Sequence, residues 1–152
     1  MGKVKNVPVI MQMEMVECGA ASLGMILAYH KKWLPLEQLR KDCGVSRDGC
    51  SAKQLLLAGR RYGMDANAYK LDEDELQEMA PVIIHWNFNH FVVYKGKIGN
   101  THYLNDPAKG KVKVLQDEFN KSYTGIALAF EPTEAFQRGG SRPSIIGFVK
   151  RR

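Results

Sequence analysis

One cysteine of this chain stands where a thiol can act as a nucleophile. Cys18 precedes the apolar series from Leu23 to Tyr29, which predicts a buried helix with the cysteine in its first turn. The free backbone N–H groups and the positive dipole end of a helix N-terminus favour a thiolate. Such a nucleophile also needs a base that can protonate a leaving amine, and histidine is the side chain suited to this task.

Of the four histidines, His90 is the best candidate for this base. It starts a strongly apolar strand just after the tight connection 87–89, at an edge from which a side chain can reach a cleft. His30 lies at the predicted end of the first helix, where a surface role is expected. His85 and His102 lie within predicted strands, and we expect both to be structural.

A third residue should orient the imidazole, and Asp106 is the candidate. It ends the next predicted strand, sixteen residues after His90. The alternative is a plain turn residue, since Asp-Pro is a common turn dipeptide. A polar amide, Gln12, lies six residues before Cys18. Together with this glutamine, the order and spacing of the other three residues resemble papain-like cysteine proteases, in which the glutamine donates to the oxyanion.

The elements that must position these residues fall into two halves. Helices are predicted from about 18 to 30, from 35 to 43 and from 51 to 62, the last with a capping box made by Ser51 and Gln54. The second half predicts strands at 66–70, 81–86, 90–94, 102–104, 111–114 and 125–130, and short helices near 72–76 and 117–123. Helices first and antiparallel strands afterwards predict an α+β domain.

Composition and charge argue against several classes of protein. The net charge of +6 includes five basic residues in the acid-free segment 136–152, which leaves about +1 for the body. This distribution argues against a nucleic-acid-binding surface. The sequence contains no P-loop, no paired Cys and His motif and no apolar run of membrane-spanning length, so we predict no metal and no cofactor. Three cysteines, an odd number, suggest free thiols in a reducing, cytoplasmic setting.

The chain further resembles the double-glycine leader peptidase domain of peptidase-containing ABC transporters, the family that exports bacteriocins and lanthipeptides. Four segments carry the resemblance: QMEMVECGAASLGMILAYH, SRDGCSAKQL, PVIIHWNFNHFVV and YLNDPAKGKVKV. It covers residues from about 7 to 132 and implies a papain-like fold, with a helical N-terminal half packed on the antiparallel sheet of the C-terminal half. Glu14 and Glu17 stand where aspartates are usual, and Cys50 stands where a serine is expected.

The resemblance implies a cysteine endopeptidase that acts by acyl transfer. Cys18 attacks the scissile carbonyl, while His90 protonates the leaving amine and later activates water. Asp106 orients His90. The Gln12 side chain and the Cys18 backbone N–H stabilise the oxyanion. The family implies cleavage after Gly-Gly or Gly-Ala, at the junction between the leader and the core of a ribosomal peptide.

A preference for glycine implies a narrow cleft, and Trp86 and Asn87 are the candidate wall residues. The alternative places the indole in the core and the asparagine in a turn. Leaders of this family bind as amphipathic helices, which require an apolar groove. The candidates for this groove are Met25, Tyr29, Leu55, Leu56 and Leu57. Because three consecutive leucines cannot all face one core, at least one should face a groove or a partner, although all five candidates can also be core residues.

Two other functions remain open at this point: a non-catalytic leader-binding domain of an exporter, and a papain-fold acyltransferase. We expect residues 1–135 to form the peptidase domain. Residues 136–152 are expected to be a basic linker tail toward a missing transmembrane domain, with Gly139-Gly140 as a flexible joint. The implied partners are the precursor peptide and the transmembrane and ATP-binding domains of a parent transporter, at the cytoplasmic face of the membrane.

Overall fold

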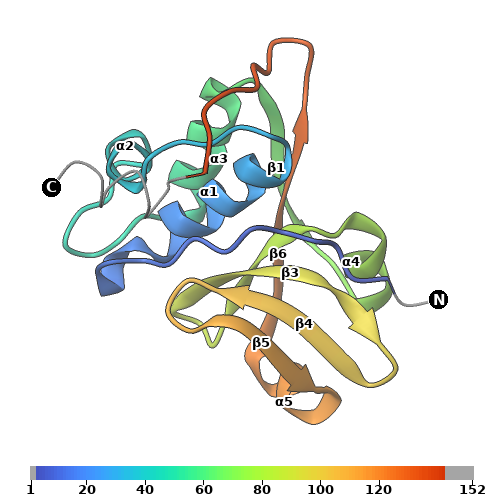
Figure 1. The fold of residues 1–152 in the computed structure, drawn as a ribbon. Coiled ribbons are helices and arrows are strands. Elements are labelled where there is room, and N and C mark those ends of the chain that lie inside the picture. The colour runs from blue at the N-terminus through green and yellow to red at the C-terminus, as the bar shows by residue number, and fades with distance from the viewer. Residues whose placement is uncertain (1–2, 143–152) are drawn as a thin grey trace, which may run out of the picture.

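The computed structural model describes residues 3–142, and it has a helical part packed against one six-stranded sheet (Figure 1). The helices are η1 (Met15–Glu17, a 3-10 helix), α1 (Cys18–Tyr29), α2 (Leu36–Asp42), α3 (Ala52–Arg61), α4 (Glu73–Met79) and α5 (Gln116–Ser122). The strands are β1 (Met64–Lys70), β2 (Val82–Trp86), β3 (His90–Ile98), β4 (Thr101–Asp106), β5 (Gly110–Leu115) and β6 (Tyr123–Pro132). The predicted α+β class, with helices before an antiparallel sheet, is confirmed.

The sheet has the order β1-β6-β2-β3-β4-β5, and its strands pair antiparallel throughout. The three strands that run from β3 to β5 are consecutive hairpin partners, so the start of β3 lies beside the end of β4. By contrast, β6 returns to pair between β1 and β2. This topology places His90, the first residue of β3, near Asp106, the last residue of β4.

Helix α1 is central because it is apolar on every side, and residues Gly19 to Ala28 are buried. It packs mainly against β3, and the Ser22 hydroxyl donates a hydrogen bond to the Phe91 carbonyl at 3.2 Å. On its other side α2 comes so close that a Cβ on Gly24 would lie 2.6 Å from Leu39 Cδ1. The helix is therefore held between two layers, and its N-terminus has a fixed position relative to β3.

Helix α3 begins with the predicted capping box. The Ser51 hydroxyl accepts a hydrogen bond from the Gln54 amide at 3.2 Å, and the Gln54 side chain accepts one from the Ser51 amide at 2.7 Å. The three leucines divide as a helix requires: Leu55 is fully buried, Leu56 is half-buried and Leu57 is 44% exposed.

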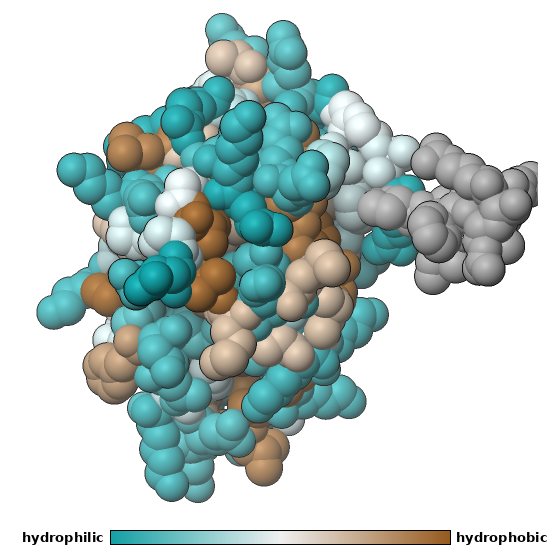
Figure 2. All heavy atoms as spheres, turned by 90° about the vertical axis from the view of Figure 1, so that its left-hand side faces the viewer, coloured by the Kyte–Doolittle hydropathy of each residue, from teal (hydrophilic) through white to brown (hydrophobic). Residues whose placement is uncertain are grey.

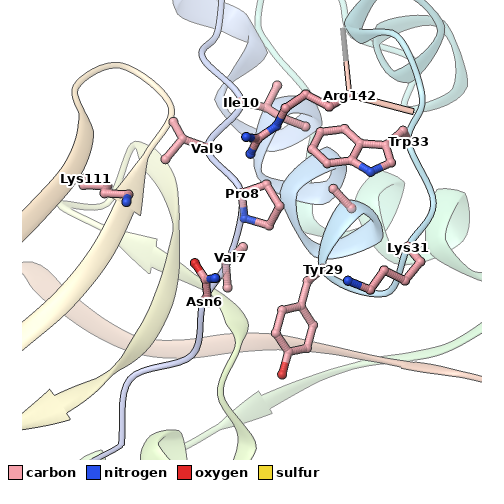
Figure 3. A pocket seen from close by; sticks show the side chains of 11 residues that line it. Asn6, Val7, Pro8, Val9, Ile10, Tyr29, Lys31, Trp33, Lys111 and Arg142 are labelled. Atoms are coloured by element: carbon pink, nitrogen blue, oxygen red, sulfur yellow. The ribbon is translucent and has the colours of Figure 1, made fainter. Parts of the chain in front are cut away.

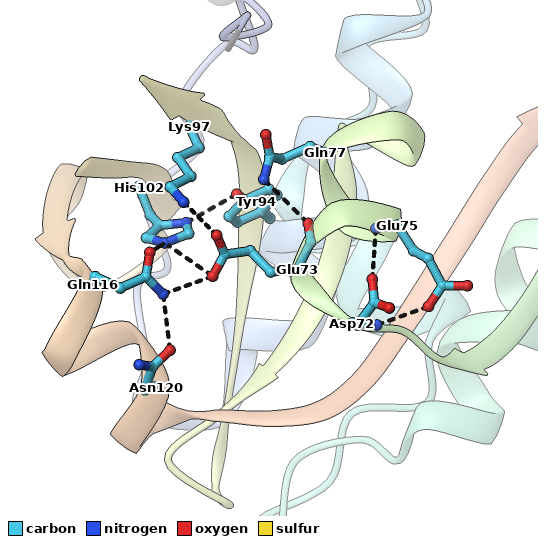
Figure 4. Close-up of polar contacts among 9 residues, drawn as sticks. All are labelled: Asp72, Glu73, Glu75, Gln77, Tyr94, Lys97, His102, Gln116 and Asn120. Carbon is cyan, nitrogen blue, oxygen red and sulfur yellow. Dashed lines mark hydrogen bonds and ion pairs between the residues drawn. The ribbon is translucent and has the colours of Figure 1, made fainter. Parts of the chain in front are cut away.

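The opposite face of the sheet carries a second core under α4 and α5. His102 is fully buried there and stacks on Phe119, with ring centroids 3.9 Å apart. Its Nδ1 meets the Tyr94 hydroxyl at 2.9 Å and its Nε2 meets Gln116 Oε1 at 3.0 Å (Figure 4). Glu73 joins this network through hydrogen bonds from Gln116 and Lys97. His102 is thus a structural residue, as predicted.

The first described residues of the predicted tail lie against the body. Phe136 is only 6% exposed and belongs to the first core, which α1 dominates. Gly139 accepts a hydrogen bond from the Trp33 amide at 2.8 Å and donates one to the Lys31 carbonyl at 3.0 Å. The Arg142 guanidinium lies 5.4 Å from the centre of the Trp33 ring. Gly139 is therefore fixed by the body and is not a free joint, while residues 143–152 lie outside the described residues.

The face on the left of Figure 1 shows small apolar patches separated by hydrophilic residues (Figure 2). Within residues 3–142, none of the helices is both long and apolar enough to cross a bilayer.

Candidate active site

Cys18 is the first residue of α1, directly after η1. Its thiol is free and half-buried, whereas the next ten residues of the helix are buried. Gly19 is necessary at the following position because a Cβ there would lie 2.9 Å from Cys50 Sγ and 3.1 Å from Leu55 Cδ1. The backbone can thus approach α3 closely, and the thiol of Cys18 stands at a helix N-terminus that cannot shift.

His90 and Asp106 form a hydrogen-bonded pair at the junction of β3 and β4. His90 Nε2 lies 2.8 Å from Asp106 Oδ1, and the side chains are 20% and 8% exposed. The same carboxylate oxygen accepts a hydrogen bond from the Ala108 amide at 2.8 Å. Because Nε2 is hydrogen-bonded to Asp106, Nδ1 is the ring nitrogen that remains available to exchange a proton with Cys18. Asp106 is therefore more than a turn residue: its buried carboxylate fixes the orientation of the His90 imidazole.

The electrostatics of the pair favour an imidazolium. Burial lowers the pKa of His90, but the hydrogen bond to Asp106 and the interaction with the Cys18 thiol outweigh burial and raise this pKa to about 9. Burial acts to raise the pKa of Asp106, yet the hydrogen bonds from His90 and Ala108 hold it below its usual value. The Cys18 thiol is thus near enough to His90 to affect the pKa of the ring, and the site favours a protonated imidazole.

Gln12 reaches the same place from the N-terminal segment. Its backbone amide donates to the Pro107 carbonyl at 2.9 Å, which ties it to the residue after Asp106. Its side-chain Oε1 is buried and has no hydrogen-bond partner among residues 3–142. Buried amide groups without a partner are costly, so Gln12 has an unused hydrogen-bonding group on a residue tied to the turn after Asp106.

Glu17 fixes the loop between Gln12 and Cys18, a role that the sequence analysis did not identify. Its carboxylate is fully buried, and Oε1 accepts hydrogen bonds from the amides of Met13 at 2.7 Å and Glu14 at 2.9 Å. Oε2 forms an ion pair with Arg40 Nε of α2 at 3.0 Å. The signal in the sequence was an acidic residue directly before the nucleophile, at the N-terminal end of a helix.

Three predicted substrate contacts are core residues instead. Met25 and Leu55 are fully buried, and Trp86 is 6% exposed with its ring 5.7 Å from that of Phe119. None of the three presents a usable surface, so the alternative of core packing is correct for them. The helix periodicity did not distinguish a groove from a second packed layer.

The other predicted contacts remain accessible. Asn87 is exposed in the β2–β3 turn, with a positive φ of 53°. Leu56 is half-buried and Leu57 is exposed on α3. Tyr29 is half-buried at the far end of α1, about 16 Å from Cys18 by the helical rise per residue. Their contacts with a substrate stay predictions.

A mostly apolar cavity of about 440 Å³ lies next to the site, and sequence reasoning did not find it. Cys50, which contacts the start of α1, and Phe91, which follows His90, both line it. The other lining residues are Ser51, Ala52, His85, Asn89 and Ile126. They come from α3, from the β2–β3 hairpin and from β6, so no single segment of sequence could reveal the cavity.

A thiol from the helical half and an imidazole–carboxylate pair from the sheet half thus lie where the two layers join, the construction of papain-like cysteine peptidases. The model of the Peptidase C39 family matches residues 6–135, and this chain belongs to that family.

Its relatives include two curated bacterial proteins. The colicin V secretion/processing ATP-binding protein CvaB of Escherichia coli is 37% identical over 134 residues, covering 88% of this chain and 19% of that protein. The lactococcin-G-processing and transport ATP-binding protein LagD of Lactococcus lactis subsp. lactis is 32% identical over 145 residues, covering 90% and 20%. The chain therefore spans about a fifth of the length of these relatives.

Solved structures are similar as well. One of them is a double glycine motif protease from an AMS/PCAT transporter in complex with the leader peptide, at 59% sequence identity and a TM-score of 0.82. The alignment covers 86% of this chain and 94% of that chain.

Proposed function

We propose that this chain is a cysteine endopeptidase that removes leader peptides after Gly-Gly or Gly-Ala. The observation that carries the proposal is the His90 imidazole, whose Nε2 lies 2.8 Å from Asp106 Oδ1 and whose pKa the Cys18 thiol helps to raise. Membership of the Peptidase C39 family and the similarity to a protease solved with its leader peptide support the same reaction and substrate class.

In the first half of the reaction, the Cys18 thiolate attacks the scissile carbonyl and the C–S bond forms. The protonated His90 then gives its proton to the departing amine as the C–N bond breaks, which leaves a thioester on Cys18. In the second half, neutral His90 takes a proton from water while the water oxygen attacks the thioester. The C–S bond then breaks, which releases the new carboxyl end of the leader and returns Cys18 to the thiolate beside protonated His90. Asp106 holds the ring in place and stabilises its protonated form through both steps.

The tetrahedral intermediates carry a negative oxygen that needs donors. We assign this role to the Gln12 side-chain amide and the Cys18 backbone N–H. The tie from Gln12 to Pro107 and the bonds of Glu17 to the connecting loop support this assignment, since they fix Gln12 before substrate arrives.

The apolar cavity beside the site is our candidate for the binding site of the leader helix. It lies against Phe91 and Ala52, and half-buried Leu56, one helical turn after Ala52 on α3, extends its apolar border. Exposed Leu57 lines a separate pocket and is a weaker candidate for this contact. An amphipathic helix places side chains at i, i+3 and i+4 on one face, which suits one pocket with an apolar border. Asn87 is retained as a cleft residue near the cut, while Trp86 supports it from the core.

We also propose that the chain works as part of a longer exporter, with transmembrane and ATP-binding domains as partners, at the cytoplasmic face of the membrane. The names of the relatives combine processing, transport and ATP binding, and this chain covers only their peptidase-sized portion. The cleavage of the leader would then be coupled to export.

The proposal is tested by incubating residues 1–152 with a synthetic precursor that carries a leader, Gly-Gly and a short core. Mass spectrometry should find two hydrolysis products cut after the second glycine, and none with Cys18→Ala or with Val-Val in place of Gly-Gly. Binding without products would instead indicate a leader-binding domain, and transfer of the leader to an added amine would indicate an acyltransferase.

The proposed binding site of the leader helix is tested separately with Ile126→Arg, which places a charge in the cavity. We expect KM for the precursor to rise about tenfold or more with little change in kcat, because the leader binds away from the reacting bond. The matched control is Ile98→Arg, at an exposed position at the end of β3 and outside the cavity. Equal KM values for the two variants would place the leader elsewhere.

A further inference from the structure

A second cavity, of about 380 Å³, lies between the N-terminal segment and the strands β3, β4 and β5. Four of its lining residues are lysines and two more carry hydrogen-bond donors: Lys5, Lys95, Lys111, Lys113, Asn6 and Tyr103. Val4 and Val112 complete the lining, which contains no acidic residue. Solvated lysines are common on protein surfaces, but four around one cavity concentrate positive charge in a small space.

Lys95 distinguishes this cavity from an ordinary basic surface. It is 7% exposed, yet it has no hydrogen bond or ion pair from its ammonium group to any residue within 3–142. Burial and the nearby charge of Lys111 both lower the pKa of Lys95. Lysine is almost never buried without a partner, because an unpaired buried ammonium is costly. The Lys95 ammonium accordingly reaches the solvent of the cavity that it lines, where it has no partner among residues 3–142 and can bind an external anion.

The backbone fixes the arrangement of these lysines. On the β4–β5 hairpin, Lys113 pairs with Tyr103 in the strand register and Lys111 pairs with Asn105. The N-terminal segment crosses over β3, where the Lys5 amide donates to the Lys95 carbonyl at 2.9 Å. The charges thus come from three separately anchored segments, and they surround the cavity before any ligand is present.

A larger cavity of about 760 Å³ adjoins this one and shares Asn6 and Lys111 with it. Figure 3 shows Lys111 extending from β5 toward the N-terminal segment, with Lys31 and Arg142 farther along the lining. Positive charge therefore continues beyond the lysine cavity. This extent suits a ligand longer than a single small anion.

We propose that the lysine cavity binds a phosphate-bearing ligand: a free polyphosphate compound or the phosphate of a lipid head group. Lysine binds phosphate as a point charge with three donors, and several lysines can match the multiple charges of such a group. A carboxylate brings at most one charge and balances this cavity less well. The site uses none of the residues proposed for peptide cleavage, so a test of phosphate binding is independent of a test of the peptidase activity.

The test is isothermal titration calorimetry of residues 1–152 with pyrophosphate at low ionic strength. Lys95→Met should weaken binding about tenfold or more, since a charge-assisted contact is lost. The control Lys121→Met removes an exposed charge on α5 and should stay within about twofold of the wild type. Equal affinities of wild type and Lys95→Met would overturn the proposal, because binding would then be a general effect of surface charge.

Two further measurements separate ligand binding from changes in folding and identify the ligand class. Thermal unfolding without ligand should show Lys95→Met melting no lower than the wild type, because the variant loses a charge that has no partner within residues 3–142 and whose pKa is lowered by burial and by Lys111. Sedimentation with vesicles of phosphatidylglycerol or phosphatidylcholine then identifies the source of phosphate. Lys95-dependent binding to the first vesicle alone assigns a lipid head group, and Lys95-dependent binding of pyrophosphate alone assigns a free phosphate compound. Absence of binding to both would refute the site.

Discussion

Two histidines on neighbouring strands, His90 and His102, have opposite electrostatic environments. His90 is the first residue of β3, is 20% exposed in its side chain and has a pKa raised to about 9. His102 lies in β4, is fully buried and has both ring nitrogens engaged, by Tyr94 and Gln116 (Figure 4). Burial lowers the pKa of His102, and its contact with Gln116 opposes this only in part.

The difference shows that a hydrogen-bonded histidine becomes a candidate base only when one ring nitrogen remains available to a reacting group. In the His102 network, an amide and a phenol use both nitrogens, so the ring can only support the core. In the His90 site, a carboxylate uses one nitrogen and the neighbour on the other side is a thiol. Substitutions at the two sites should therefore differ in kind.

The largest effect is expected for His90→Ala. The variant keeps the fold, because His90 is at a strand edge, but Cys18 loses its base and its acid. We expect kcat/KM for a Gly-Gly precursor to fall on the order of 10⁴-fold or more, as measured by product formation. Retention of a tenth of the wild-type activity would show that another group moves the proton.

Next in size is Asp106→Asn, which removes the charge that supports the imidazolium. We expect kcat/KM to fall about 10²-fold, with the pH profile moved. In the wild type the protonated ring persists below pH 9 and is lost as pH rises through about 9, so activity should fall there. In the variant this alkaline limb should lie at lower pH. The control Asp117→Asn, on exposed α5, should leave the limb unchanged.

Glu17→Gln should give an intermediate effect. The variant retains the shape of the side chain but weakens its hydrogen bonds to the amides of Met13 and Glu14, so Gln12 is held less firmly. We expect kcat to fall about tenfold with a smaller change in KM, because charge-assisted hydrogen bonds are the stronger ones. Glu37→Gln, at an exposed position of α2, is the matched control. An equal loss of kcat in both variants would show that Glu17 does not position Gln12.

The smallest effect on the chemistry is expected for His102→Ala. The variant loses the ring stacked on Phe119 and leaves Tyr94 and Gln116 without their partner. Its free energy of unfolding should fall by about 3 kcal/mol in urea denaturation. Activity per folded molecule should change less than about threefold. A large loss of kcat in the folded variant would contradict the separation of the two histidines.

Sequence reasoning located the elements well because their local signals were strong. The capping box of Ser51 and Gln54, the all-round apolar pattern after Cys18 and the strands on either side of the turn at 87–89 all depend on residues close in sequence. His90 could be separated from His102 for the same reason, since its position at a strand edge is a local property.

What the sequence did not predict depends on packing between distant segments. Met25 and Leu55 have the periodicity of a groove face, but both are fully buried in the first core. The cavity beside the active site joins α3 to three strands, and the role of Glu17 depends on Arg40 of α2. The burial of Phe136 in the first core likewise requires contacts with α1 that composition alone does not reveal.

The central claim is that the fold holds His90 as an imidazolium beside Cys18 and holds His102 as a neutral core residue. The direct test is an NMR titration of the imidazole Cε1–H signals of both rings, assigned with His90→Ala and His102→Ala. The account predicts that His90 titrates near pH 9 and that His102 titrates below its usual value of 6.5. A His90 midpoint at or below 6.5, or a His102 midpoint above that of His90, would contradict it.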